Sequence, residues 1–354
     1  MQQKIDFTYG FPAFSKEKQP LKFNHNKVPV ADIWSFWNYI IKEYAKTIEK
    51  KDILFSLLEQ SKTFYQAAEN ADLRSKPLLY YYSFLNFAKL NIELESNFEK
   101  HQRFDHGINP SDSNTFVFAS DSVDILKLNS GETSPKKRSV CYELMDIVEA
   151  EILHTFPPKL NLKIKDLLKH CVGVHRTYAN VYREDEIFSR IEKHELIKEG
   201  KKLIYKALLQ DTKKHKNFNA LKSVYGTNLI EDGEKVYFIV EYQMNSYQVT
   251  NKVLFELSHQ IRKFGIWQYI NRDGYKFYLS SCVNNRYSPS FIIFVIMFYL
   301  GSITRYHPYL YDDIFSQSDQ WVISEFLYTQ PKQFLFLTTS KVLGVELREP
   351  YSKF

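Results

Sequence analysis

The chain has 354 residues, of which 44% are hydrophobic and 25% charged, a balance that excludes an intrinsically disordered chain. Its formal net charge is +6, from 47 Lys and Arg against 41 Asp and Glu, which excludes a polycation and permits nucleic-acid contact without implying it. Three widely separated cysteines, Cys141, Cys171 and Cys282, exclude a disulfide framework and a paired CxxC metal site. We therefore expect a globular protein in a reducing, cytoplasmic setting.

The first helical pattern begins near Val30. Residues 1–29 carry scattered Pro, Lys and Asn without a sustained period, so we expect an extended N-terminal arm there. Residues 30–110 predict an N-terminal helical region, whose second half holds a long helix over 78–94 with Pro77 in its first turn. The first helix face recurs at three- and four-residue spacing: Ile33, Trp34, Trp37, Ile40, Ile41 and Tyr44.

The middle of the chain changes character. Residues 111–235 predict a mixed, mainly helical region that opens with one or two short strands within 115–128 and turns helical from Val140. The charged stretch 184–222 predicts further helices. We expect most of this region to pack as helices with little β structure.

The last third of the chain contains the clearest strands. Residues 236–285 predict a small β-containing segment with strands over 236–242 and 274–280. Residues 286–354 predict a C-terminal helical region that packs on the N-terminal helices. Its apolar run, 291–300, is about half of the roughly 20 residues that a bilayer crossing needs, so we expect a buried core helix and no membrane span. The fold class is mostly α with a small β component (α+β), built on a multi-helix core for which a HEPN-like helical bundle is one alternative.

Three short segments resemble a known family. They are residues 76–89 (KPLLYYYSFLNFAK), His106-Gly107-Ile108, and residues 298–308 (FYLGSITRYHP). Their order and spacing are similar to those of the YaaC-like bacterial family, whose activity is largely unassigned. The resemblance implies a bacterial cytoplasmic protein and, for some members, a place in anti-phage defence operons.

Arg305 and His307 are the first candidate catalytic residues. An Arg and a His at a helix end can bind a scissile phosphate and move a proton, the two tasks of metal-independent RNA cleavage. The HEPN ribonucleases use such a pair at a wider spacing, whereas only Tyr306 separates the two residues here. The favoured alternative is structural: Arg305 pairs with a carboxylate such as Asp312, and His307 caps the helix.

A second cluster consists of His101, Arg103, Asp105 and His106, followed by Gly107. Two histidines with an Asp between them are compatible with a metal ligand set or a general base. The spacing is one residue wider than a helical ligand pair needs, and no third ligand is recognisable. We favour the alternative that His106 holds the turn through backbone hydrogen bonds.

Cys171 is a third candidate, because His170, His175 and Arg176 lie close to it in sequence. Nucleophilic catalysis by a thiol needs a lowered thiol pKa. Cys171 sits in an apolar helical stretch, where a buried, inert thiol is far more common. We expect it to be structural.

Two basic stretches are candidates for binding nucleic-acid phosphates. Such contacts would make binding fall with salt, although a solvated helix face is the usual role of a charged run. The residues are Lys136, Lys137 and Arg138 in a polar loop, and Lys213, Lys214 and Lys216.

The chain contains no GxxxxGK[ST], GxGxxG, HExxH, GxSxG or paired CxxC pattern. We therefore expect no metal and no cofactor, and a nucleotide-driven role would have to come from a partner chain. The favoured function is a non-catalytic binding or accessory component of a bacterial cytoplasmic complex, with anti-phage defence as one setting.

We expect its partner to be a protein from the same operon, such as an ATPase or a nuclease. Homo-oligomerisation and nucleic-acid contact stay open, and no membrane partner is expected. Two alternatives remain: a divergent HEPN-like, metal-independent ribonuclease of the abortive-infection type, and a sequence-independent nucleic-acid-binding protein.

Overall fold

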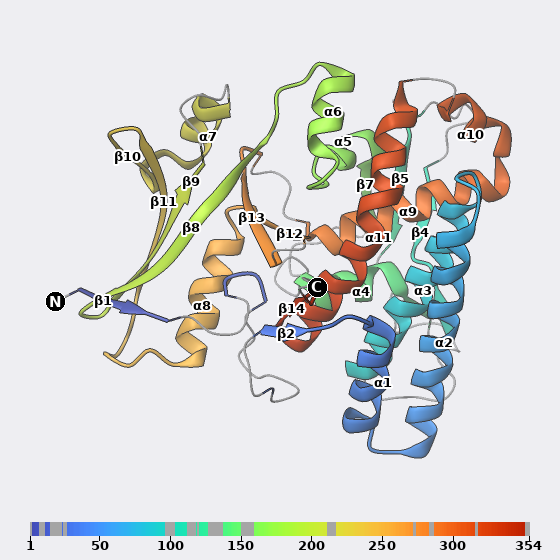
Figure 1. The fold of residues 1–354 in the computed structure, drawn as a ribbon, viewed down its shortest axis with the longest axis horizontal. Coiled ribbons are helices and arrows are strands. Elements are labelled where there is room, and N and C mark those ends of the chain that lie inside the picture. Colours follow the sequence, from blue (N-terminus) through green and yellow to red (C-terminus); the bar gives the residue numbers. More distant parts are fainter. Residues whose placement is uncertain are drawn as a thin grey trace. The chain divides into compact units, whose positions relative to one another are not determined.

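The structure is a computed structural model that describes residues 2–6, 11–14, 23, 27–95, 103–111, 118, 120–126, 137–149, 159–210, 217–271, 274–282, 287–315 and 318–350. The chain forms two compact units. Unit 1 contains Met1–Ala31, Glu184–Arg286 and Thr339–Phe354, and unit 2 contains Asp32–Arg183 and Tyr287–Thr338. The predicted α+β fold with a multi-helix core is confirmed (Figure 1).

Unit 1 is built on a seven-stranded sheet in which all pairings are antiparallel. The strand order is β10-β11-β9-β8-β13-β12, and β1 pairs with β8. The strands are β1 (Gln2–Ile5), β8 (Phe188–Glu199), β9 (Lys202–Leu209), β10 (Leu229–Asp232), β11 (Lys235–Gln243), β12 (Ile266–Asn271) and β13 (Gly274–Ser280).

The prediction of helices over residues 184–222 is wrong where β8 and β9 lie. In β9 every second residue is buried, from Leu203 to Leu209, while the residues between them stay half-exposed. This period of two is the mark of a strand with one buried face. The Lys and Glu residues of the exposed face gave the stretch its charged, helix-like composition.

Two helices and a smaller pair of strands complete unit 1. The helices are α7 (Asn217–Tyr225) and α8 (Asn251–Arg262), with a 3₁₀ turn at Gly226–Asn228. The Tyr225 hydroxyl contacts the carbonyls of Phe264 and Ser280, which ties α7 to β13. The strands β2 (Lys27–Pro29) and β14 (Glu346–Arg348) pair in parallel, so β1 and β2 of the N-terminal arm are both paired within unit 1.

Unit 2 is a helical assembly with two small β elements. Parallel strands β3 (Arg103–Asp105) and β6 (Lys137–Ser139) form one, and antiparallel strands β4 (Ile108–Pro110), β5 (Ser122–Leu126) and β7 (Lys159–Lys163) form the other. The helices are α1 (Ile33–Tyr44), α2 (Ile48–Asn70), α3 (Lys76–Glu95), α4 (Val140–Glu149), α5 (Ile164–Leu168), α6 (His175–Tyr182), α9 (Pro289–Tyr306), α10 (Pro308–Phe315) and α11 (Asp319–Leu343), of which the last residues belong to unit 1.

Helices α3 and α9 form the centre of unit 2. Helix α9 begins where the Ser288 hydroxyl accepts a hydrogen bond from the Phe291 N–H, with Pro289 as its first residue. Aromatic rings fill the space around the helix pair, and Phe84 of α3 stacks on Phe334 of α11 at 4.1 Å between ring centroids. Among the described residues, α9 alone is long and apolar enough to cross a membrane. Of its 18 residues, 72% are buried inside the structure.

Gly301 lets α9 approach α3 closely. A Cβ at this position would lie 3.0 Å from the Cβ of Tyr81 and 3.3 Å from the carbonyl oxygen of Pro77. These distances are shorter than ordinary van der Waals contact, so a larger residue would push the helices apart. Arg305 follows one helical turn later and faces the same part of α3.

Candidate functional site

Three segments that are far apart in sequence meet in unit 2. Tyr81 of α3 and His106, from the turn between β3 and β4, share a hydrogen bond between the tyrosine hydroxyl and the imidazole Nδ1. Their rings stack at 5.7 Å between centroids. At the end of α9, Arg305 donates from Nη1 to the Tyr82 hydroxyl at 2.9 Å. Together with Lys89 of α3, these four residues form what we call the His106 cluster.

Backbone hydrogen bonds fix the turn that carries His106. The His106 carbonyl accepts from the Cys141 N–H at 3.1 Å, at the beginning of α4, and the Gly107 carbonyl accepts from the Leu126 N–H at 3.0 Å. The Gly107 N–H donates to the Asp105 carboxylate at 3.0 Å. The turn is therefore held by α4, by β5 and by its own Asp, which leaves the His106 ring little freedom to shift.

Gly107 is required by both conformation and space. Its φ of +67° lies in the left-handed region, and a Cβ there would lie 1.6 Å from the Ser139 hydroxyl oxygen. That same hydroxyl accepts from the Tyr142 N–H at 3.2 Å, as the cap of α4. The histidine turn thus lies directly against the first turn of α4.

The surroundings of His106 favour its neutral form. Burial against neighbouring rings is the largest cause that lowers the pKa of His106, and the positive charges of Lys89 and Arg305 lower it further. Asp105 acts in the opposite direction, more weakly than Lys89 and more strongly than Arg305. The residue nevertheless remains exposed at the surface, so a ligand can reach it.

Burial also shifts the pKa values of Lys89 and Tyr81, in each case toward the neutral form. Burial lowers the pKa of the Lys89 ammonium and raises the pKa of the Tyr81 hydroxyl, because each charged form loses hydration. The Lys89 ammonium lies 5.7 Å from the centroid of the Phe104 ring on β3. A partly dehydrated cation beside a neutral histidine is an arrangement that favours an incoming anion.

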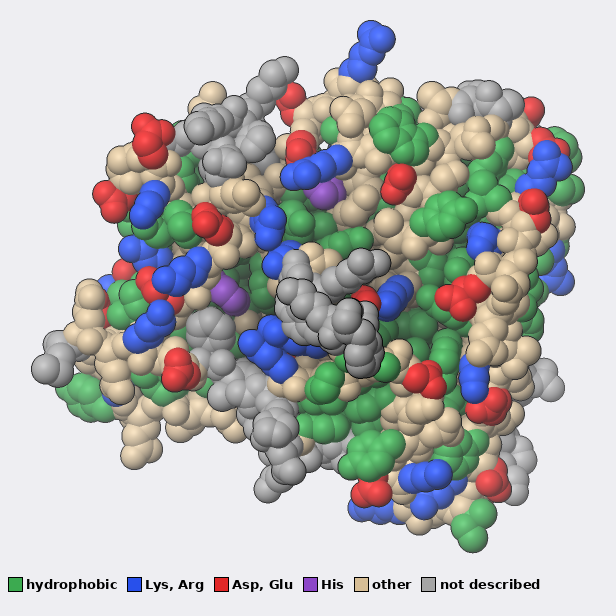
Figure 2. Space-filling view, viewed as in Figure 1, with side chains coloured by type: hydrophobic (Ala, Val, Ile, Leu, Met, Phe, Trp, Pro, Cys, Tyr) green, Lys and Arg blue, Asp and Glu red, His purple; other side chains and the backbone are tan. Residues whose placement is uncertain are grey.

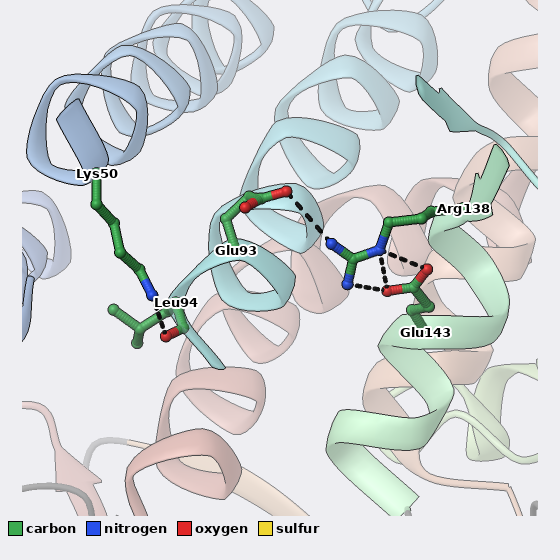
Figure 3. Close-up of polar contacts among 5 residues, drawn as sticks. All are labelled: Lys50, Glu93, Leu94, Arg138 and Glu143. Carbon is green, nitrogen blue, oxygen red and sulfur yellow. Dashed lines mark hydrogen bonds and ion pairs between the residues drawn. The ribbon is translucent and has the colours of Figure 1, made fainter. Parts of the chain in front are cut away.

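Arg138, a predicted nucleic-acid-binding residue, is engaged by two carboxylates (Figure 3). Its Nε donates to Glu143 of α4 at 2.8 Å, and its Nη1 lies 3.5 Å from Glu93 of α3. The Arg138 side chain is only 15% exposed. These contacts hold β6 between α3 and α4, which favours a structural role over phosphate binding.

The other predicted phosphate-binding residues are not placed. Lys136, Lys213, Lys214 and Lys216 lie outside the described residues, as does the side chain of Lys137. Figure 3 also shows Lys50 of α2, which donates to the Leu94 carbonyl at 3.2 Å and so binds the C-terminal end of α3.

The expected pairing of Arg305 with Asp312 is wrong, because Arg74 takes that carboxylate at 3.0 Å. Arg305 instead reaches Tyr82 and acts on His106. His307 is the C-cap of α9, as the structural alternative predicted, with its N–H donating to Ile303 at 2.8 Å.

The third candidate cluster has the character of a protein core. Cys171 is fully buried, which raises the pKa of its thiol, and the thiol contacts the Leu167 carbonyl at 3.8 Å. Burial lowers the pKa of His170 to about 3. His175 accepts at Nδ1 from the Gly173 N–H at 3.1 Å. A protonated thiol beside a neutral His170 agrees with the structural interpretation.

The sequence-based prediction did not include the residues of α3 among the candidate site residues. Tyr82, Lys89 and Glu93 fall on one helix face at seven- and four-residue spacing, inside a largely buried helix. The available signal was a lysine, Lys89, in the middle of a largely buried helix. His101 and the side chain of Arg103 lie outside the described residues, and among those described no three His, Cys, Asp or Glu side chains gather as a metal site.

Replacing Gly107 tests the turn. Gly107→Ala and Gly200→Ala both place a Cβ at a φ near +60°, but nothing lies within 4 Å of the Cβ at Gly200. We expect Gly200→Ala to lower the free energy of unfolding by about 1–2 kcal/mol. Gly107→Ala should cost a further ~1–3 kcal/mol through overpacking. Urea unfolding measures both.

A double variant provides the control. Gly107→Ala with Ser139→Gly removes the atoms nearest to the new Cβ, while glycine still serves as a helix cap at a cost of a few tenths of a kcal/mol. We expect it to recover most of the additional loss. Equal unfolding free energies for Gly107→Ala and Gly200→Ala would contradict the packing of this turn.

Comparison with known proteins gives one match. A family model described as YaaC-like Protein matches residues 11–342. No curated protein and no solved structure matches the chain. The matched region contains α3, the His106 turn and α9, and therefore the whole His106 cluster. The chain belongs to the YaaC-like family.

Proposed function

We propose that this YaaC-like protein is a binding component of a bacterial cytoplasmic complex, and that the His106 cluster takes a phosphate-bearing ligand. The observation that carries the proposal is that adjacent residues of α3 hold the two groups: Tyr81 is hydrogen-bonded to His106, and Tyr82 accepts from Arg305. The charges of Lys89 and Arg305 both lower the pKa of that surface histidine. A phosphate at this position would supply a negative charge to both cations and accept hydrogen bonds from their donors.

Arg305 is well suited to this role. Its guanidinium has five N–H donors in a planar fork, of which Nη1 donates to the Tyr82 hydroxyl. This hydrogen bond orients the group while other donors remain at the exposed end of α9. An oriented guanidinium loses less conformational entropy on binding than a free side chain does.

The Tyr81 hydrogen bond favours binding over proton abstraction. Because burial raises the pKa of Tyr81, its hydroxyl keeps its proton. When that hydroxyl donates to Nδ1 of His106, the neutral ring carries its proton on Nε2. The ring then presents a hydrogen-bond donor to the ligand.

The charge distribution supports a local site. Figure 2 shows Lys and Arg side chains interspersed with Asp and Glu over the visible face, without a continuous basic surface. Because the His106 cluster contains two cations, Lys89 and Arg305, we expect few phosphate contacts and a weak dependence on salt. The family resemblance favours a protein partner from the same operon and a setting in anti-phage defence.

Substitutions at the cluster test the binding proposal. We expect Arg305→Gln and Lys89→Met to weaken binding of a labelled oligouridylate by roughly tenfold each, because a charge-assisted hydrogen bond contributes about 1.5–3 kcal/mol. Each should reduce the slope of log affinity against log salt by about 0.7. Fluorescence anisotropy at several salt concentrations measures both quantities.

The matched control is Arg74→Gln, which removes an exposed arginine of the same unit that pairs with Asp312. It should bind the oligouridylate as the wild type does. If Arg305→Gln retains wild-type affinity and salt slope, the proposed site is wrong.

A metal-independent ribonuclease is the second candidate function. The lowered pKa of His106 favours it, because a neutral imidazole at neutral pH can accept the proton of a ribose 2′-hydroxyl. The 2′-oxygen would bond to phosphorus, the bond to the 5′-oxygen would break, and that oxygen would take a proton from water. His106 would then replace His307 as the partner of Arg305.

Incubation of end-labelled RNA in EDTA separates the two functions. The binding proposal predicts intact RNA with the wild type, with His106→Ala and with His307→Ala. Cleavage by the wild type and by His307→Ala, lost in a folded His106→Ala variant, would instead establish the ribonuclease. Cleavage lost only in His307→Ala would return the site to the Arg305–His307 pair.

A further inference from the structure

We infer that Tyr306 is a stacking platform for an unpaired base, which makes the ligand of the His106 cluster a single-stranded nucleic acid. The inference rests on the proposed function, because it places a phosphate at Arg305 and adds what binds beside it. It concerns the exposed aromatic rings that follow Arg305 in the chain.

Tyr306 lies at the edge of the His106 cluster. It is the last residue of α9 and is 61% exposed, although residues 290–301 of the same helix are buried. Its hydroxyl is near enough to raise the pKa of Tyr81, the hydrogen-bond partner of His106. A large exposed ring therefore adjoins the cations that we assign to a phosphate.

Arg305 connects the ring to the phosphate site. Its guanidinium carbon lies 4.9 Å from the centroid of the Tyr306 ring, within the range of a cation–π contact. The same guanidinium donates to Tyr82. The contact orients the ring beside the guanidinium, while most of the tyrosine surface stays available to a base.

A second exposed ring follows three residues later in the chain. Tyr309, at the start of α10, is 62% exposed, and its ring stands edge-on to the His307 ring at 6.1 Å between centroids. Arg305, Tyr306 and Tyr309 thus offer one cation followed by two rings. Proteins that bind single strands combine cations for the backbone with aromatic side chains for successive bases.

Stacking on an exposed tyrosine favours a single-stranded nucleic acid over a duplex. Bases in a duplex already stack on one another and hide their faces, whereas an unpaired base can stack on a tyrosine whatever its sequence. A single exposed tyrosine is ordinary on a protein surface. Tyr306 combines two features that carry the inference: the Arg305 guanidinium lies against its ring, and it acts on Tyr81, the hydrogen-bond partner of His106.

The experiment compares three variants and four labelled probes. Tyr306→Ala removes the ring, Tyr306→Phe keeps it, and Tyr39→Ala removes a tyrosine of α1 that is 52% exposed and lies outside the cluster. The probes are single-stranded RNA, the matching RNA duplex, an abasic ribose-phosphate strand of equal length, and single-stranded DNA. The DNA strand shows which sugar the site takes.

We expect the wild type to prefer the base-bearing single strand over the duplex and the abasic strand. Tyr306→Ala should weaken that preferred binding about tenfold, the effect of one lost base stack. Tyr306→Phe and Tyr39→Ala should keep wild-type affinity. Because none of these substitutions removes a Lys or an Arg, none should change the salt slope.

The probes distinguish failure of this inference from failure of the proposed function. If the abasic strand binds as tightly as RNA and still depends on Arg305, phosphate binding stands and the stacking platform is wrong. If Tyr306→Ala binds single-stranded RNA as the wild type does, the platform is also wrong. If no probe binds, both proposals are overturned.

Discussion

The close approach of α9 to α3 at Gly301 is the contact on which the rest of unit 2 depends. A Cβ at Gly301 would lie 3.0 Å from the Cβ of Tyr81, so the two backbones meet where no other residue would fit without a shift. Burial of both helices supplies the apolar contact that holds them together. This approach brings Arg305 to Tyr82 and lets Tyr81 face His106.

The site joins a rigid part of the core to an exposed surface. The His106 turn is anchored by α4 and β5 through its backbone, and Gly107 leaves it no room for a side chain. The polar side chains of the His106 cluster belong to elements that apolar packing holds in place. The cations are therefore oriented before a ligand arrives. Arg138, between Glu93 and Glu143, strengthens the same framework rather than adding to the surface charge.

Local sequence patterns predicted the elements whose apolar residues recur with a strong period. The features that the sequence did not predict depend on contacts between segments far apart in the chain. The helices over 78–94 and from Pro289 are confirmed, because their apolar residues and first-turn prolines are local signals. Strands β8 and β9 were missed because their exposed charges hid an alternation that only burial makes plain. His106 and Arg305 were each singled out, but as members of separate clusters. Their meeting depends on how α3 and α9 pack, which no spacing within either segment specifies.

The pKa of His106, measured by NMR titration of its ring protons with and without a saturating oligouridylate, tests the central claim most directly. In the free protein we expect a pKa below the ordinary value, because burial, Lys89 and Arg305 all oppose protonation. A bound phosphate would favour the protonated ring, so the account predicts that the pKa rises on binding and that affinity increases as pH falls through this range. An unchanged His106 pKa in the saturated complex would show that the ligand binds elsewhere.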